Sequence, residues 1–228
     1  MAVVEVRDLK KTYKLGKITV EALRGVTVDI KQGDFVTFAG PSGSGKTTLL
    51  NLIGGLDDIT EGEILLDGRK INDLGQGRLS EIRLQKIGFI FQQYNLIPVL
   101  TAYENIEYPL LLQGVGDAER RSRIEAALKE VNIGELSSRR PNDMSGGQQQ
   151  RVAIARALAI RPKIVLADEP TANLDSKNSE SLIDLMREIN GRDGVTFIFS
   201  THDQMVMGKS KRLLYLKDGR IEKEEKRP

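Results

Sequence analysis

The sequence predicts a single α/β domain, in which an antiparallel sheet precedes a core of alternating strands and helices, with a helical subdomain inserted into the core. Three observations support this fold class. The first forty residues alternate β-branched and polar side chains, as half-buried strands do. Strand-like and helix-like segments alternate on both sides of the middle of the chain. Between them, residues from about 92 to 161 carry little strand signal.

We assign all 228 residues to this one domain. Residues 1–91 and 162–228 are expected to form the core together with the antiparallel sheet, and residues 92–161 the helical subdomain. A chain of this length can bury a full hydrophobic core without disulfides or metals. No internal repeat is visible, which excludes solenoids and tandem arrays.

Each expected element has its own local pattern. Runs rich in β-branched residues predict strands, at 3–13, 20–30, 34–39, 63–67, 87–91, 164–167 and 196–200. Turns are expected at 15–17 and 31–33. Apolar residues at helical spacing predict helices, at 46–54, 117–131, 145–160 and 176–190. A hairpin of 212–216 and 220–224, turned at Asp218–Gly219, closes the chain, and residues 224–228 are expected to form a frayed charged tail.

Composition excludes several classes of protein. The 34 Lys and Arg residues nearly balance the 32 Asp and Glu residues, for a net charge of +2, which is not the strongly basic balance of a nucleic-acid-binding protein. There is no Cys and only one His, which excludes disulfide frameworks, thiolate sites and multi-His metal centres. No apolar run approaches the length of a membrane span, and residues 1–11 lack a signal-peptide core. We therefore expect a soluble, cytoplasmic domain.

A glycine-rich loop between an expected strand and an expected helix carries the strongest chemical signal. Its sequence matches the phosphate-loop pattern G-x-x-x-x-G-K-[ST] in the structural context that this pattern requires. The glycines allow backbone N–H groups to surround phosphate oxygens, and the helix that follows adds the positive end of its dipole. The predicted nucleotide-binding set is Gly40, Pro41, Ser42, Gly43, Ser44, Gly45, Lys46, Thr47 and Thr48.

Two adjacent acids end a later apolar strand. The carboxyl end of a core strand in an α/β sheet is where ligands bind, so Asp168 and Glu169 are expected beside the phosphate loop. Asp168 suits a water-mediated Mg²⁺ contact, with the Thr47 hydroxyl as a direct ligand. Glu169 is then placed to act as general base on the attacking water. The alternative is an ordinary strand that ends in solvated charges.

A second candidate phosphate-binding segment lies about 100 residues after the first. Ser145 is expected to cap a helix, and Gly146 and Gly147 permit close backbone approach to an anion at the helix start. The plain alternative is a capped amphipathic helix. However, the run from Met144 to Leu158 resembles the signature motif of ATP-binding cassette (ABC) ATPases, with Met144 where Leu is usual and with Ser145, Gly146, Gly147 and Gln148 as the motif's phosphate-contacting residues.

The resemblance covers essentially the whole chain and implies roles for four more residues. Gln92 resembles the glutamine that binds Mg²⁺ and water and senses a membrane partner. His202 resembles the histidine that contacts the γ-phosphate, and Asp175 an aspartate that crosses to a second subunit. Tyr13 resembles the aromatic residue that stacks on adenine. Taken singly, each would be interpreted as an ordinary surface or packing residue.

The resemblance also implies a mechanism. Two chains would form a head-to-tail homodimer, in which each ATP, with Mg²⁺, lies between Lys46 of one chain and Ser145 of the other. Glu169, His202 and Gln92 would be the catalytic residues. An integral membrane permease would dock near residues 92–108, where aromatic and apolar residues lie on a stretch expected to be irregular. The protein would then be peripheral, at the cytoplasmic face of the inner or plasma membrane.

Within this family, the segments 91–98, 100–106 and 146–151 resemble the lipoprotein-releasing (LolD) and macrolide-exporter (MacB-like) ATPases, including the cell-division FtsE type. That branch implies a partner with four membrane helices and a large extracytoplasmic domain. The alternatives are an importer subunit and a non-transport regulator of cell-wall hydrolysis. A nucleic-acid-linked cassette ATPase and an unrelated phosphate-loop kinase fit less well, because the basic clusters are interspersed with acids and a kinase does not explain residues 145–148.

Overall fold

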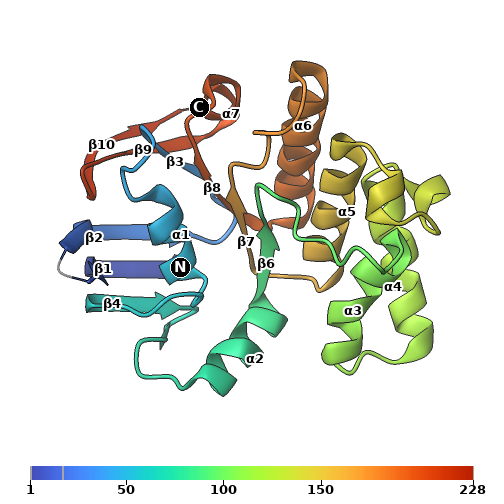
Figure 1. Ribbon diagram of the computed structural model, residues 1–228, viewed down its shortest axis with the longest axis horizontal. Coiled ribbons are helices and arrows are strands. Elements are labelled where there is room, and N and C mark those ends of the chain that lie inside the picture. Colours follow the sequence, from blue (N-terminus) through green and yellow to red (C-terminus); the bar gives the residue numbers. More distant parts are fainter. Residues whose placement is uncertain (1, 17, 228) are drawn as a thin grey trace.

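The computed structural model describes residues 2–16 and 18–227 of the chain (Figure 1). Residues 17 and 228, which belong to a predicted turn and to the predicted tail, lie outside the described residues. The fold consists of two sheets and seven α-helices across this described part. None of its helices combines the length and the apolar character that a bilayer crossing requires.

The first sheet is antiparallel and has the strand order β2-β1-β4-β5. It consists of β1 (Ala2–Leu15), β2 (Ile18–Lys31), β4 (Glu61–Leu66) and the short β5 (Arg69–Lys70). Val26, Val28 and Ile30 are buried while their neighbours along β2 are exposed or half-buried. This alternation puts one face of the sheet into the core and the other toward solvent.

The second sheet forms the core and has the order β10-β9-β3-β8-β7-β6. Its strands are β3 (Phe35–Ala39), β6 (Ile87–Ile90), β7 (Ile164–Asp168), β8 (Thr196–Thr201), β9 (Arg212–Lys217) and β10 (Arg220–Lys226). β3 pairs in parallel with β8 and β9, and β7 in parallel with β6 and β8, whereas β10 pairs antiparallel with β9. Every residue of β3 and β8 is buried, as expected for parallel strands covered on both faces.

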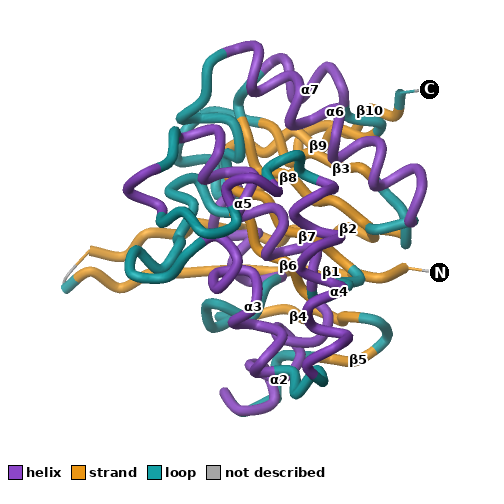
Figure 2. The backbone as a smooth tube through the Cα atoms, turned by 90° about the vertical axis from the view of Figure 1, so that its right-hand side faces the viewer, coloured by secondary structure: helices purple, strands orange, loops and turns teal. Residues whose placement is uncertain are grey.

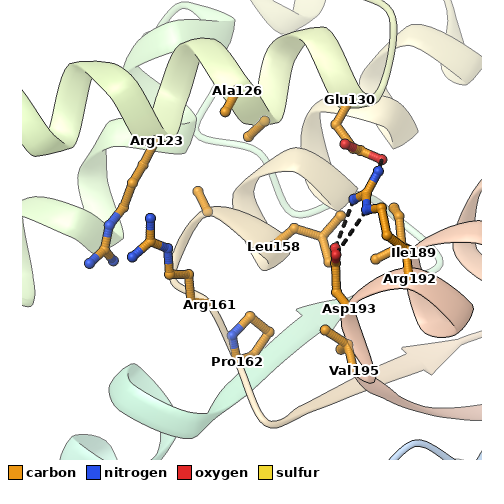
Figure 3. Close-up of a pocket in the computed structure, with 12 residues that line it drawn as sticks. Arg123, Ala126, Glu130, Leu158, Arg161, Pro162, Ile189, Arg192, Asp193 and Val195 are labelled. Atoms are coloured by element: carbon orange, nitrogen blue, oxygen red, sulfur yellow. Dashed lines mark hydrogen bonds and ion pairs between the residues drawn. The ribbon is translucent and has the colours of Figure 1, made fainter.

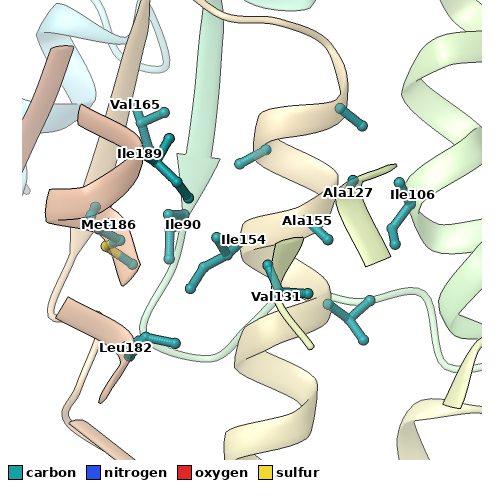
Figure 4. Close-up of a cluster of buried hydrophobic side chains, with 14 of the residues drawn as sticks. Ile90, Ile106, Ala127, Val131, Ile154, Ala155, Val165, Leu182, Met186 and Ile189 are labelled. Carbon is teal, nitrogen blue, oxygen red and sulfur yellow. The ribbon is translucent and has the colours of Figure 1, made fainter. Parts of the chain in front are cut away.

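The two faces of the core sheet bury different helices. Helix α1 (Lys46–Ile53) packs, together with the antiparallel sheet, against the side that carries Ile164 and Leu166. Helices α5 (Gly146–Ala159) and α6 (Ser176–Asp193) pack against the opposite side, where Val165 belongs to one hydrophobic cluster with side chains of both helices (Figure 4). The helices that follow the two predicted phosphate-binding segments therefore cover opposite faces of one sheet.

A helical layer lies between β6 and β7 in the sequence. It contains α3 (Ala102–Leu112), α4 (Asp117–Glu130) and α5, with short 3₁₀ turns at Gly134–Leu136 and Pro141–Asp143. Ile106, Ile124 and Ala155, one from each helix, are completely buried in a shared hydrophobic cluster. Figure 1 shows this layer on the side of the molecule away from the antiparallel sheet, and Figure 2 views the molecule from that side.

An ion-pair cluster joins the helical layer to the core helix α6. Arg192 at the end of α6 contacts Glu130 of α4 at 3.0 Å and its neighbour Asp193 at 2.7 Å (Figure 3). The hydrogen bonds to these two carboxylates raise the pKa of Arg192. The cluster borders a cavity of about 470 Å³ where the C-terminal ends of α4, α5 and α6 converge. Basic residues at helix C-terminal ends are favourable because of the helix dipole.

Three helices depart from the sequence-based expectations: α2 (Gln76–Lys86), α3 and α7 (Gln204–Lys209). α2 has no fully buried residue, and Leu79 and Ile82 are only partly buried against the core, so its apolar stripe is too weak to predict a helix. For α3, the stretch expected to be irregular is helical from Ala102 onward. Its start carries a capping box, in which Thr101 and Glu104 bond each other's backbone amides.

The predicted frayed tail is also wrong. β10 continues to Lys226, and the Arg227 amide donates to the Lys211 carbonyl at 2.8 Å. Arg212 pairs with Glu224 at 2.9 Å across the two strands of the hairpin. In the register of the hairpin Arg212 lies opposite Lys226, so its ion pair with Glu224 is a diagonal one. Diagonal pairs of opposite charge on antiparallel strands stabilise the pairing, which favours an edge strand in this charged sequence.

β6 packs closely against α5 at Gly88, which leaves no room for a side chain. A Cβ atom at this position would lie 2.7 Å from the Ala157 carbonyl oxygen and 3.1 Å from the Ala157 Cβ. We therefore expect Gly88→Ala to lower the free energy of unfolding by about 1–3 kcal/mol through overpacking, measured by urea or thermal unfolding. Gly191→Ala is the matched control, because a Cβ atom added there would meet nothing within 4 Å among the described residues and alanine is the better helix former. Equal stabilities of the two variants would contradict the packing argument.

Candidate nucleotide-binding site

The glycine-rich loop connects β3 to α1 and contains backbone positions that only glycine tolerates. Gly40 has φ 153° and Gly45 has φ 103°. A Cβ atom would lie 2.1 Å from the Leu216 carbonyl oxygen at Gly40 and 2.6 Å from the Ala22 carbonyl oxygen at Gly45. Gly45 is also the N-cap of α1 and offers no capping side chain, so the first amides of α1 stay available to an anion.

Lys46 lies within this loop and is only 6% exposed. Its ammonium donates to the carbonyl oxygens of Gly40 at 2.8 Å and Pro41 at 2.9 Å. Burial lowers the pKa of Lys46, and the nearby carboxylates of Glu169 and Asp168 oppose this effect. The loop therefore encloses a positive charge that faces the acids at the end of β7.

Two groups suited to a divalent cation meet at the start of α1. The Thr47 hydroxyl donates to Asp168 Oδ1 at 2.9 Å, which joins the loop to the end of β7. A hydroxyl and a carboxylate are the hard oxygen donors that Mg²⁺ prefers. Nearby, the Ser44 hydroxyl is buried without a hydrogen-bond partner among the described residues. The donor set and the glycine-lined cradle fit a Mg²⁺–nucleoside triphosphate.

Glu169 follows directly and has an unusual backbone. Its φ of 43° lies in the left-handed region, and its amide donates to the Ser200 carbonyl at 2.8 Å. The carboxylate accepts from the Thr201 hydroxyl at 2.7 Å and contacts His202 Nδ1 at 2.7 Å. Since a carboxylate only accepts, this contact requires the proton on Nδ1. The Glu169 side chain is 15% exposed, whereas the His202 side chain is 70% exposed.

Thr201 is a site residue that the sequence analysis missed. It ends β8, directly before His202, and its hydroxyl fixes one oxygen of Glu169. The signal was present in the sequence, since Thr201 stands between a buried strand and the predicted histidine. A hydroxyl at a strand end has so many ordinary uses that only the observed contact identifies it.

Gln92 lies just beyond β6, which neighbours β7 in the core sheet. Its carbonyl accepts a hydrogen bond from Asn173 Nδ2 at 2.8 Å, and its side chain is exposed. The structure thus places Gln92 at the same sheet edge as Asp168 but shows no side-chain bond from it to Thr47 or Asp168 within the described residues.

Tyr13 on β1 approaches the site from the antiparallel sheet. Its hydroxyl donates to Asp57 Oδ2 at 2.6 Å. Burial and this hydrogen bond raise the pKa of Tyr13, and the nearby Thr48 side chain lowers it. The ring therefore lies beside the first turn of α1, next to the phosphate loop.

The segment Ser145–Gln148 has the predicted capped structure. The Gln148 amide donates to Ser145 Oγ, and the Ser145 amide donates to Gln148 Oε1 at 2.9 Å. Ser145 is exposed, and a Cβ at Gly146 would lie 2.7 Å from the Tyr94 hydroxyl. Among the described residues, no hydrogen bond links this segment to residues 40–48. The chain's own loop and its own signature segment are therefore separate sites.

Asp175 lies close to that segment. It caps α6 by accepting from the Asn178 amide at 3.0 Å, and a Cβ atom added at Gly147 would lie 3.5 Å from the Asn178 side chain. Hydrogen bonds from Asn178 to the carboxylate lower the pKa of Asp175. The start of α6 and the start of α5 thus form one continuous surface.

A parallel core sheet with a phosphate loop after β3 and paired acids after β7 defines the class of phosphate-loop nucleoside triphosphatases. A family model described as "ABC transporter" matches residues 23–172. The ABC transporter ATP-binding protein MJ0796 of Methanocaldococcus jannaschii is 50% identical and covers 98% of this chain and 97% of its own length. The chain belongs to the ABC transporter family and is an ATP-binding ATPase of that family.

Solved structures agree with this assignment. A dimeric structure of MJ0796 in a post-hydrolysis state, bound to ADP and Pi, has a TM-score of 0.92 with 98% of each chain covered. The macrolide export ATP-binding/permease protein MacB of Syntrophobacter fumaroxidans is 45% identical over 98% of this chain. This chain spans only 32% of that MacB protein. The predicted family and fold class are confirmed.

Proposed function

We propose that this chain drives a MacB- or LolD-type membrane complex by closing around ATP as a head-to-tail dimer. One observation carries the proposal: the phosphate loop and the segment Ser145–Gln148 begin helices on opposite faces of the core sheet. A two-fold related copy can supply the missing segment to each loop, which makes two equivalent sites. The solved structure of MJ0796 bound to ADP and Pi is dimeric, which supports a dimer of this chain.

In one chain, different residues bind the triphosphate, hold Mg²⁺ and activate the attacking water. The loop amides and Lys46 hold the triphosphate, and Thr47, Asp168 and Gln92 would hold Mg²⁺. When bound, Mg²⁺ neutralises charge on the phosphate oxygens. Glu169 takes a proton from the attacking water as general base. Thr201 and His202 hold its carboxylate, and the exposed side of His202 is free to meet the γ-phosphate.

The second chain contributes the anion-binding end of α5. Ser145, Gly146, Gly147 and Gln148 would contact the γ-phosphate across the interface, and Asp175 would contact the partner subunit. Because the γ-phosphate is shared between two chains, its loss removes contacts from both of them. Hydrolysis then shifts the equilibrium toward separated subunits.

The permease would dock in a groove of about 530 Å³ between the core and the helical layer. Exposed apolar side chains line it, among them Leu56, Tyr108 and Leu112. Arg83 and Arg156 also line it, and no Asp or Glu does within the described residues. An amphipathic helix of the permease that carries a carboxylate fits this groove by shape and charge.

The segment after Gln92 connects this groove to the ATP site. Arg156 of α5 donates to the Tyr94 carbonyl at 2.9 Å and to the Asn95 carbonyl at 2.5 Å. Displacement of this segment by a partner is therefore transmitted to the helix that carries Ser145. We divide the chain accordingly, with residues 92–161 as the moving helical subdomain and 1–91 and 162–228 as the body.

The family branch determines the partner. A MacB- or LolD-type partner has four membrane helices and a large extracytoplasmic domain, and lipoprotein extraction, peptide or drug export, or force transmission would be the output. The MacB relatives favour this branch. The chain would then lie at the cytoplasmic face of the membrane. The alternatives are an importer subunit and an FtsE-like regulator of cell-wall hydrolysis.

Glu169→Gln tests the catalytic base. We expect ATP binding to remain, phosphate release to fall at least a hundredfold, as for loss of a general base, and an ATP-dependent dimer to accumulate. Phosphate release and light scattering after gel filtration measure these outcomes. Glu180→Gln removes an exposed acid of α6 that pairs with Lys209 and should leave both unchanged. Turnover of Glu169→Gln at the wild-type rate would exclude Glu169 as the base.

Mixing two inactive variants tests the head-to-tail geometry. Lys46→Ala and Ser145→Arg each inactivate both sites of their own homodimer. In a mixed dimer, one site combines both defects and the other has neither. An equal mixture should therefore regain roughly a quarter of the wild-type sites by statistics. If each signature segment served its own chain, the mixture would stay inactive.

A pull-down tests the branch and the groove together. Tagged Glu169→Gln with ATP should recover from native membranes a partner with four spans and a large extracytoplasmic domain, identified by mass. Leu112→Ser in the groove should reduce that recovery severalfold without changing ATP hydrolysis in the Glu169 wild-type background. Ile18→Ser, an exposed apolar position outside the groove, is the control. A partner with five or more spans and no such domain would favour an importer.

A further inference from the structure

A buried lysine lies under the tyrosine that faces the nucleotide site. Lys11 is 7% exposed, although it belongs to a sheet with one face toward solvent. Its ammonium donates to Asp57 Oδ1 at 2.7 Å and to the Asp58 carbonyl at 2.6 Å. It also lies 4.7 Å from the centre of the Tyr13 ring. Asp57 and Asp58 have no role in the proposed catalytic mechanism, and the third contact is with the Tyr13 ring.

Asp57 holds both side chains at once. One carboxylate oxygen accepts from Lys11, and the other accepts from the Tyr13 hydroxyl at 2.6 Å. Burial alone would raise the pKa of Asp57, but hydrogen bonds from Lys11, Tyr13 and the Asp58 amide outweigh burial and lower it. The carboxylate therefore stays ionised at neutral pH and keeps both donors.

This network restricts the orientation of the ring. A tyrosine side chain has two torsion angles, and the bond to Asp57 anchors its far end. The Lys11 ammonium occupies one face of the ring, which leaves the opposite face for stacking. Asp57 lies in the loop that follows α1, so the network also ties the ring to the helix that starts at Lys46.

We infer that Lys11 and Asp57 are positioning residues that hold the Tyr13 ring in the orientation in which it stacks on the nucleobase. The inference rests on the proposed stacking role of Tyr13. The network is expected to increase the affinity for the nucleobase but not the affinity for the phosphates, because residues 40–48 bind the phosphates without it. Preorganisation of this kind increases affinity because less side-chain freedom is lost on binding.

The test compares two ligands, ATP and inorganic tripolyphosphate, each with Mg²⁺, by calorimetric titration of the full chain. Tyr13→Ala should weaken ATP binding about tenfold or more, the range of one aromatic–base stack. Asp57→Asn and Lys11→Met should weaken ATP binding about threefold to tenfold by freeing the ring. All three variants should bind tripolyphosphate like the wild type, and kcat at saturating ATP should be unchanged in Asp57→Asn and Lys11→Met.

Conservative and neighbouring variants separate positioning from folding. Lys11→Arg keeps a cation that can reach Asp57 and should restore most of the affinity for ATP. Lys10→Met removes a neighbouring but exposed ion pair, with Glu61 at 2.7 Å, and should affect neither ligand. If Lys11→Met does not fold, Tyr13→Phe tests the same link, because it keeps the ring and removes the hydroxyl that bonds to Asp57.

Combining substitutions with Tyr13→Ala tests whether the network acts through the Tyr13 ring. In Tyr13→Ala, adding Asp57→Asn should cause no further loss of ATP affinity. Equal losses for ATP and tripolyphosphate, or a full additional loss in the Tyr13→Ala background, would overturn the positioning role. An unchanged ATP affinity in Tyr13→Ala would instead refute the proposed stacking, and this result is distinguishable from the other two.

Discussion

The parallel pairing of β3, β8 and β7 is the constraint on which the site depends. These neighbouring strands are in register, so that Ala39 lies beside Thr201 and Asp168 beside Ser200. The loop follows β3, the acids lie at the end of β7, and the Thr201–His202 pair lies at the end of β8. Because carboxyl ends of parallel strands meet at one sheet edge, groups more than 120 residues apart come within hydrogen-bonding distance, as between Thr47 and Asp168.

The same edge explains the strained backbone at the catalytic acid. Glu169 leaves β7 with a positive φ, which costs free energy for a residue with a side chain. The bonds from its amide to the Ser200 carbonyl and from Thr201 to its carboxylate hold that conformation. The neighbouring strand β8 thus supplies both the backbone support and the orientation of the side chain.

Burial on both faces of the core sheet separates two functions within one chain. One face receives the nucleotide-binding helix α1, and the other receives α5 with the helical layer. The segment between β6 and α3 bridges them through backbone carbonyls that accept from Arg156 and Asn173. These bonds link the segment after Gln92 to the signature helix and to the residues before α6, whereas no hydrogen bond joins the two phosphate-binding segments in the described part of the chain.

Local sequence patterns identified most of the strands, the phosphate loop, the paired acids and the capped helix at Ser145, because each depends on local spacing, glycine geometry or a capping residue. Other features depend on contacts between distant parts of the chain, including β5 and the end of β10, which local patterns did not predict. The apolar residues of α2 are at most partly buried, so its periodic signal is weak. The charged C-terminal residues form a strand in which Glu224 makes a diagonal ion pair with Arg212. The Glu169–Thr201 and Lys11–Asp57–Tyr13 contacts join residues distant in sequence, and such pairings depend on which strands become neighbours.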